Sequence, residues 1–124
     1  ITVDMGRCPD LVPTVSAAAA FASTPTTINN VAHLRIKETD RLAACADEVS
    51  RTQAETEIVE DSLIIRPGRL PKGHPVSFST YNDHRMAMSM SLFKLADMDV
   101  TLDNPACVNK SFPGFFDEWK KITD

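Results

Sequence analysis

Charged side chains are crowded at the start of one predicted helix. The stretch LRIKETDR at 34–41 lies between an apolar β-branched segment and a run of good helix formers. The first N–H groups of a helix lack partners and favour anions. Lys37 and Arg41 suit a phosphate or carboxylate ligand, and share a face if the helix has begun by Lys37. Glu38 between them could transfer a proton. The alternative is a solvated helix start with Thr39 as its N-cap.

A second charged cluster, NDHR at 82–85, opens another predicted helix. Asp83 is a candidate N-cap. His84 and Arg85 then fall in the first turn, where cations oppose the helix dipole. Their placement is reasonable if an anion is held there, and otherwise both side chains point into solvent.

Three further polar residues stand out by position. Lys110 precedes the last predicted helix, for which Ser111 is the expected N-cap. Asp10 precedes the first predicted helix and is by default another N-cap. His33 has no second ligand at metal-type spacing, so we expect a structural or substrate-contact role and no metal site.

The elements that would position these residues alternate along the chain. We expect strands at 2–5, 26–31, 55–59, 63–66, 76–79 and 100–102, and helices at 11–22, 39–51, 84–95 and 112–122. The Pro/Gly-rich segment at 67–75 is predicted to be an exposed connection.

The order of elements repeats on either side of that connection. In each half the first helix is apolar nearly all round, which is typical of a buried helix, and the second is one-sided. Asp10 precedes Lys37 by as many residues as Asp83 precedes Lys110. We therefore predict two copies of one βαβα unit, with a closing pair of strands in the first copy only. The predicted units are about 1–67 and about 76–124, with a linker at about 67–75.

Composition narrows the class of protein. The 124 residues carry a net charge of −4, and the basic residues form no stripe, which argues against a nucleic-acid surface. No apolar run is long enough to cross a bilayer. The three cysteines have no metal-type or redox spacing. These features favour an intracellular, cytoplasmic α/β protein without a membrane partner.

Four motifs resemble the successive signatures of the 5-enolpyruvylshikimate-3-phosphate synthase family, in that family's order. They lie at 9–14, 34–41, 81–88 and 110–113. The resemblance implies two domains, each of three βαβαββ units, with the active site between them. This chain would be about two of the three units of one domain, in the C-terminal part. The implied reaction transfers enolpyruvyl from phosphoenolpyruvate to the 5-hydroxyl of shikimate 3-phosphate, without metal or organic cofactor.

The resemblance also implies residue roles. Two residues would move protons: Asp10 at the attacking hydroxyl and Glu38 at the methylene carbon of phosphoenolpyruvate. Those that would hold phosphoenolpyruvate are Arg41, His84, Arg85 and Lys110. Those that would contact shikimate 3-phosphate are Asp10, His33 and Lys37.

Nothing in the chain resembles the family's N-terminal domain, whose loops supply the rest of the site. We therefore expect half a site, inactive alone, whose partner is the missing N-terminal portion. A non-catalytic anion-binding module is the alternative, but it would need the cations without both Asp10 and Glu38. Another transferase of the same fold is a second alternative.

Overall fold

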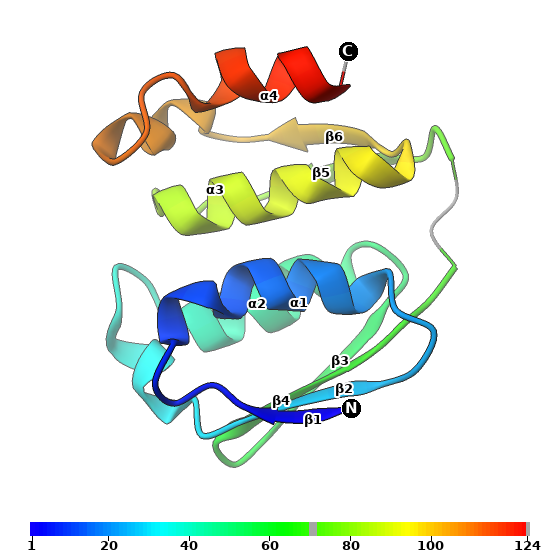
Figure 1. Ribbon diagram of the computed structural model, residues 1–124, viewed down its shortest axis with the longest axis vertical. Helices are drawn as coiled ribbons and strands as arrows, with labels where there is room; N and C mark the ends of the chain where they lie inside the picture. The colour runs from blue at the N-terminus through cyan, green and yellow to red at the C-terminus, as the bar shows by residue number, and fades with distance from the viewer. Residues whose placement is uncertain (70–71, 124) are drawn as a thin grey trace.

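Two β-sheets enclose a layer of helices (Figure 1). The computed structural model describes residues 1–69 and 72–123. The larger sheet has the order β1-β2-β4-β3, and the smaller pairs β5 with β6. The strands are β1 (Thr2–Asp4), β2 (Thr26–Asn29), β3 (Glu55–Val59), β4 (Ser62–Arg66), β5 (Pro75–Phe78) and β6 (Asp99–Leu102).

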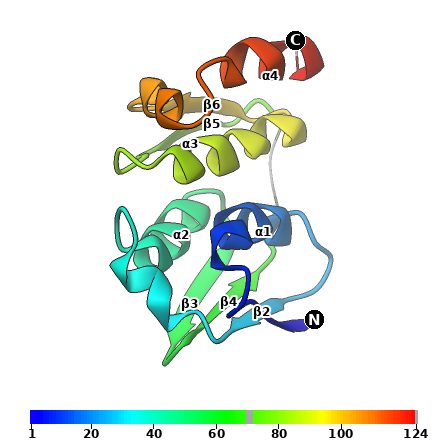
Figure 2. The same ribbon diagram turned by 60° about the vertical axis from the view of Figure 1, so that its left-hand side comes forward.

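The helices are stacked between and above the sheets. The α-helices are α1 (Val12–Ala20), α2 (Arg41–Ser50), α3 (His84–Met90) and α4 (Phe115–Thr123). The 3-10 helices are η1 (Pro9–Leu11), η2 (Ala32–Ile36), η3 (Ser91–Ala96) and η4 (Pro105–Lys110). Figures 1 and 2 show α1 and α2 on the larger sheet, α3 above them, then β5 and β6, with α4 outermost.

The two innermost helices are buried, as their apolar composition predicts. Val12 and Ala17 of α1 and Met86 and Met90 of α3 have no exposed surface. The helices also meet through a hydroxyl pair, Thr14 Oγ1 to Ser89 Oγ at 3.0 Å. Small residues on α1 let α3 approach closely, so the core is continuous between the two sheets.

The two halves share one topology. β1 is parallel to β2, with α1 between them in sequence, and β5 is parallel to β6, with α3 between them. The first half then adds the β3–β4 hairpin, whose β4 pairs antiparallel with β2. The fold is therefore α/β and built from repeated βαβα elements, with the closing hairpin in the first half alone among the described residues.

The start of α2 differs from the prediction. The helix begins at Arg41 and not at residue 39, and Asp40 is its N-cap in place of Thr39. Asp40 Oδ1 accepts the N–H of Ala43 at 3.0 Å. Lys37 follows η2 in an extended conformation, so Lys37 and Arg41 do not share a helix face. The carboxylate caps because its position allows it to reach the third helical N–H.

Two other helix bounds were predicted too generously. α4 begins at Phe115 rather than at 112, and Ser111 does not cap it. Phe112 precedes Pro113, and a residue before proline is disfavoured in the α region. The helix predicted at 84–95 changes to 3-10 geometry after Met90. The prediction of Asp83 as an N-cap is confirmed, because its Oδ1 accepts from the Arg85 N–H at 2.9 Å.

The predicted connection at 67–75 is exposed at most of its described positions. Residues 70–71 of it lie outside the described residues. Gly68 is required by a close approach, since a Cβ there would lie 2.0 Å from the carbonyl oxygen of Gln53. No helix in the described part of the chain is both long and apolar enough to span a membrane.

Candidate active site

Arg41 lies at the centre of a group of charged side chains from four segments. Its side chain is 1% exposed. Nε and Nη2 donate to the two oxygens of Asp83 at 2.7 and 3.2 Å, and Nη1 donates to Asp10 Oδ1 at 3.1 Å. Nη2 also donates to Glu38. With Arg85, these residues form what we call the Arg41 cluster.

The charge state of Arg41 is fixed by its partners. Burial disfavours the charged guanidinium, but the hydrogen bond and charge of Asp83 outweigh it, helped by Glu38 and Asp10. Together they raise the pKa of Arg41 above its ordinary value. A buried cation surrounded in this way is a permanent positive charge.

Asp83 is the site residue that sequence reasoning placed only as a helix cap. It has no exposed surface, and its oxygens serve Arg41 and the N–H of Arg85 together. The repeat gave one signal, since Asp83 stands in the second half where Asp10 stands in the first. Its burial against Arg41, distant in sequence, had no sequence signal.

Asp10 bridges the two arginines of the cluster. Oδ1 accepts from Arg41, and Oδ2 lies 3.4 Å from Nη2 of Arg85. The Asp10 side chain is 50% exposed and that of Glu38 51%. Both carboxylates are therefore held by a buried cation and still open to a ligand, which is the arrangement a proton-transfer group requires.

Lys110 reaches the same end of the molecule from η4. Its Nζ donates to the carbonyl oxygen of Asn82 at 2.7 Å, directly before Asp83. Tyr81 and Asn82 both have left-handed backbones, with φ of 56° and 54°. This turn presents Lys110 beside the residues that begin α3. In Figure 1, α1, α3 and α4 all start at the left-hand end, where this group is assembled.

Three predicted residues, Lys37, His33 and His84, make no side-chain hydrogen bond or ion pair with the cluster among the described residues. Lys37 is exposed, and its ammonium has no hydrogen-bond or ion-pair partner among residues 1–69 and 72–123. His33 Nε2 and His84 Nδ1 are buried atoms without a hydrogen-bond partner there. His84 is nevertheless adjacent in sequence to two cluster residues. Both ring nitrogens are covered by the surrounding protein, so a ligand atom could reach either of them only after a side-chain movement.

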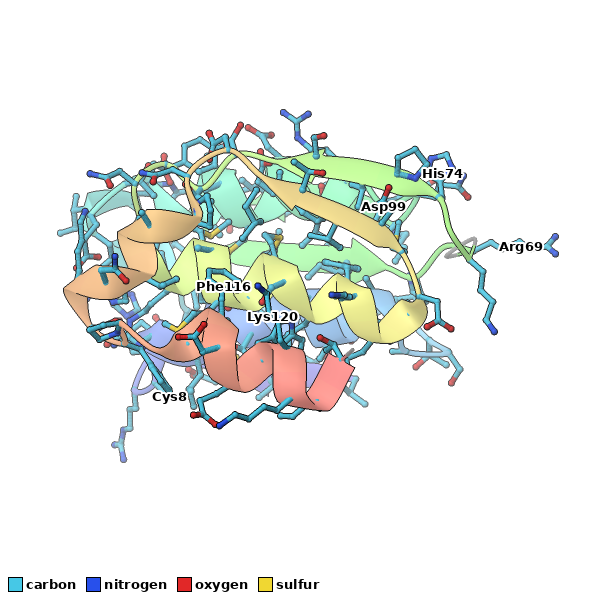
Figure 3. The ribbon with its side chains drawn as sticks, turned by 90° about the horizontal axis from the view of Figure 1, so that it is seen from above. Cys8, Arg69, His74, Asp99, Phe116 and Lys120 are labelled. Carbon is cyan, nitrogen blue, oxygen red and sulfur yellow. The ribbon has the colours of Figure 1, made fainter. Side chains whose placement is uncertain are left out.

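An apolar groove of about 320 Å³ lies elsewhere, between α4 and β6. Phe116, Trp119 and Leu102 line it, and no cluster residue does. Figure 3 shows Phe116 and Lys120 along α4, with Cys8, close in sequence to Asp10, at one end of the molecule. Within the described residues no group of three His, Cys, Asp or Glu side chains could hold a metal ion. The chemistry is therefore concentrated in the Arg41 cluster and Lys110.

Comparisons with known proteins show which family the chain resembles. The family model described as EPSP synthase (3-phosphoshikimate 1-carboxyvinyltransferase) matches residues 1–119. The 3-phosphoshikimate 1-carboxyvinyltransferase of Histophilus somni (strain 2336) is 45% identical over 123 residues, 99% of this chain and 28% of that protein. The enzyme of the same name from Haemophilus influenzae is 44% identical over 122 residues, 98% of this chain and 28% of that protein.

Solved structures give the same result. The structure titled as EPSP synthase from Acinetobacter baumannii superposes with a TM-score of 0.78 at 30% identity. The match covers 91% of this chain and 27% of that one. The chain thus spans a little over a quarter of the length of its relatives.

Proposed function

We propose, because this chain belongs to the EPSP synthase (3-phosphoshikimate 1-carboxyvinyltransferase) family, that it supplies one side of an enolpyruvyl-transfer site. The reaction would move the enolpyruvyl group of phosphoenolpyruvate to the 5-hydroxyl of shikimate 3-phosphate. Membership of the family implies the class of reaction, which is enolpyruvyl transfer in the shikimate pathway. The substrates, the residue roles and the incomplete site are the proposal.

The observation that carries the proposal is the pairing of two half-exposed carboxylates with one buried arginine. Asp10 and Glu38 both contact Arg41. An anion-binding module would gain nothing from carboxylates beside its cations, because they repel the ligand. An addition–elimination reaction does need them. One proton must leave the attacking hydroxyl and another must reach the methylene carbon, and we assign these steps to Asp10 and Glu38 respectively.

The phosphoenolpyruvate anion is assigned to the cations around the turn that begins α3. The Arg85 side chain is 37% exposed. Lys110 is also exposed, and its Nζ donates to the carbonyl oxygen of Asn82, three residues before Arg85. His84 directly precedes Arg85 in sequence, and its buried Nδ1 would have to be uncovered to meet the ligand. Fixed cations of this kind hold the phosphate and carboxylate and stabilise the charge of the tetrahedral intermediate.

Arg41 would join phosphoenolpyruvate only by exchanging partners. Among the described residues one Nη1 N–H has no acceptor, but it is buried with the rest of the side chain, and Asp83 binds the Nε–Nη2 edge of the guanidinium. Glu38 and Asp10 are half exposed and can turn toward substrate without exposing the core. Arg41 would then release a carboxylate to the reaction and donate to a substrate oxygen in its place.

Shikimate 3-phosphate is assigned to Asp10, Lys37 and His33. Lys37, whose ammonium is unpaired among the described residues, would meet its phosphate or hydroxyls, and His33 would donate or accept through Nε2. Asp10 would orient the attacking hydroxyl. The family resemblance implies no metal or organic cofactor for this chemistry.

The rest of the site would come from the N-terminal portion of the same enzyme. The chain covers 28% of its relatives' length, and all of the assigned groups lie at one end of it. We assign the chain to the C-terminal part of the enzyme, in units of about 1–67 and 76–124 joined at about 67–75, in a cytoplasmic setting. Alone it would bind anions weakly and not catalyse.

Turnover of the two substrates tests the proposal. The chain is assayed alone and mixed with a separately made N-terminal portion of such a synthase. Activity only in the mixture supports the proposal, and Arg85→Ala should lower the rate of that mixture by about 10²-fold or more. Activity of the chain alone would contradict the incomplete site. A folded chain that binds phosphate, with no turnover in the mixture, would favour the anion-binding module.

A further inference from the structure

Glu48 is a fully buried carboxylate outside the Arg41 cluster. It lies on α2 with no exposed surface, and it accepts two hydrogen bonds and forms one ion pair. Oε1 accepts from the Ser79 N–H at 2.7 Å and pairs with Arg51 Nε at 3.1 Å, while Oε2 accepts from the Tyr81 hydroxyl at 2.7 Å. A buried carboxylate is costly unless it is fully paired, so its presence calls for a reason.

The donors of Glu48 belong mainly to the turn between β5 and α3. Tyr81 and Asn82 are consecutive left-handed residues, a conformation that bulky L-residues rarely adopt. Tyr81 is 38% exposed, so packing alone does not hold it. The bond from its hydroxyl to Glu48 ties this strained turn to a helix of the first half.

The same turn carries groups of the proposed site. Thr80 is fixed by Asp103 Oδ1, which accepts from its N–H at 3.0 Å and from its hydroxyl at 2.8 Å. Asn82 gives its carbonyl to Lys110, and Asp83 binds Arg41. A small backbone rotation at Asn82 would therefore move both the carbonyl oxygen that binds Lys110 and the carboxylate of Asp83.

We propose that Glu48 is a positioning residue for this site. Through Tyr81 it holds the strained turn in the conformation that aligns the Asn82 carbonyl for Lys110 and Asp83 for Arg41. The inference deepens the proposed function and rests on it for the identity of the substrate, because Lys110 and Arg85 are the groups assigned to phosphoenolpyruvate. The contact itself joins α2 to the start of α3 whatever the substrate is.

Steady-state kinetics of the reconstituted mixture test the positioning role. Tyr81→Phe removes the hydroxyl and keeps the ring. We expect the KM for phosphoenolpyruvate to rise about tenfold, the size of one lost hydrogen bond, with the KM for shikimate 3-phosphate changed by less than about twofold. The matched control is Arg51→Gln, which removes another partner of Glu48 and leaves the turn untouched. It should change neither KM.

Two kinetic results would overturn the proposal. One is an unchanged KM for phosphoenolpyruvate in Tyr81→Phe. The other is a loss of kcat alone, matching a smaller folded fraction measured by circular dichroism, since this indicates a merely structural role.

A second experiment needs no turnover and uses the chain itself. Backbone amide signals are compared by NMR in the natural chain, Tyr81→Phe and Arg51→Gln. Shifts in Tyr81→Phe that reach Asp83 and Arg85 support the positioning role, and shifts that stop at Tyr81 and Glu48 overturn it. If the natural mixture turns over neither substrate, the proposed function fails and this comparison still decides the role of Glu48.

Tyrosine absorbance checks that the contact forms in solution. Tyr81 is the single tyrosine of the chain. Burial, then the hydrogen bond and charge of Glu48, and then Asp47 raise its pKa above the ordinary value, while Arg51 lowers it. Glu48→Gln should therefore bring the tyrosinate transition down toward about pH 10. An unchanged transition would show that the bond is absent.

Discussion

At the scale of single residues, the Arg41 cluster shows how a buried cation and accessible carboxylates can coexist. Asp83 shares the buried position of Arg41, whereas Asp10 and Glu38 are about half exposed. A buried ion pair repays its desolvation only with close geometry and further hydrogen bonds. Asp83 supplies these, so the two outer carboxylates are free to change partners without leaving Arg41 uncompensated.

Because Asp83 is the buried partner of Arg41, we predict that its substitution lowers the free energy of unfolding by a large amount. Asp83→Asn keeps the shape and can still cap α3, but it removes the charge that faces Arg41 in the interior. Breaking one side of a buried pair costs about 3–5 kcal/mol, and we expect about 3 because Asp10 and Glu38 remain. Urea unfolding followed by circular dichroism measures it.

The matched control for Asp83 is Asp61→Asn. Asp61 pairs with Arg35 at 3.4 Å on the surface, where both side chains are exposed. Exposed pairs contribute about 0–1 kcal/mol, so this variant should be almost as stable as the natural chain. Similar losses in both variants would show that Asp83 is not the partner that compensates Arg41.

At the scale of elements, the start of α2 determines where the cluster lies. Asp40 caps the helix, and Arg41 is therefore its first residue, pointing into the interior toward α3. A start at residue 39 would leave Arg41 on the same face of the helix but would change the path of the preceding segment, which carries Lys37 and Glu38. The cap thus links local structure directly to the site.

Substitutions at the two candidate caps distinguish these starts. Asp40→Ala removes the acceptor of the Ala43 N–H and should lower the free energy of unfolding by about 1 kcal/mol. Thr39→Ala removes the cap expected from sequence, which makes no capping bond in the structure, and should be nearly neutral. Thermal unfolding of both variants gives the comparison. A larger loss in Thr39→Ala would contradict the Asp40 cap.

How far the sequence predicts these elements depends on the range of the forces involved. The strands, the buried helices and the repeat follow from local periodicity, and Asp83 as a cap follows from residue type. The 3-10 segments η1, η2 and η4 carry no comparable pattern. Pro113 could have corrected the start of α4, because the residue before a proline disfavours helix.

Sequence motifs singled out several residues of the Arg41 cluster, but they did not predict its geometry. The motif residues Asp10 and Arg85 are in contact. Burial of Arg41, by contrast, depends on Asp83 arriving from the other half of the chain. The same holds for Glu48, which has the appearance of an ordinary helix-surface glutamate until α3 and its turn cover it. Tertiary contacts of this kind have no local signal.

At the scale of the whole molecule, the helices and strands of the second half are less buried than those of the first half. In the first half β4 pairs with β2, and seven residues of α2 are buried. In the second half β6 pairs with β5 alone among the described strands, and α4 has no buried residue. An apolar groove lies between α4 and β6. We therefore expect stability to be lower around α4.

Trp119 makes this difference measurable, because it is the single tryptophan of the chain and stacks on Phe115 within α4. Its fluorescence should change at a lower urea concentration than the circular dichroism of the whole chain, since α4 can detach while the core around α1 and α3 stays packed. Hydrogen exchange provides an independent check: amides of α4 should exchange before those of β2 and β4. Coincident fluorescence and dichroism transitions with uniform protection would mean that both halves unfold as one cooperative unit, and the inequality in burial would then have no consequence for stability.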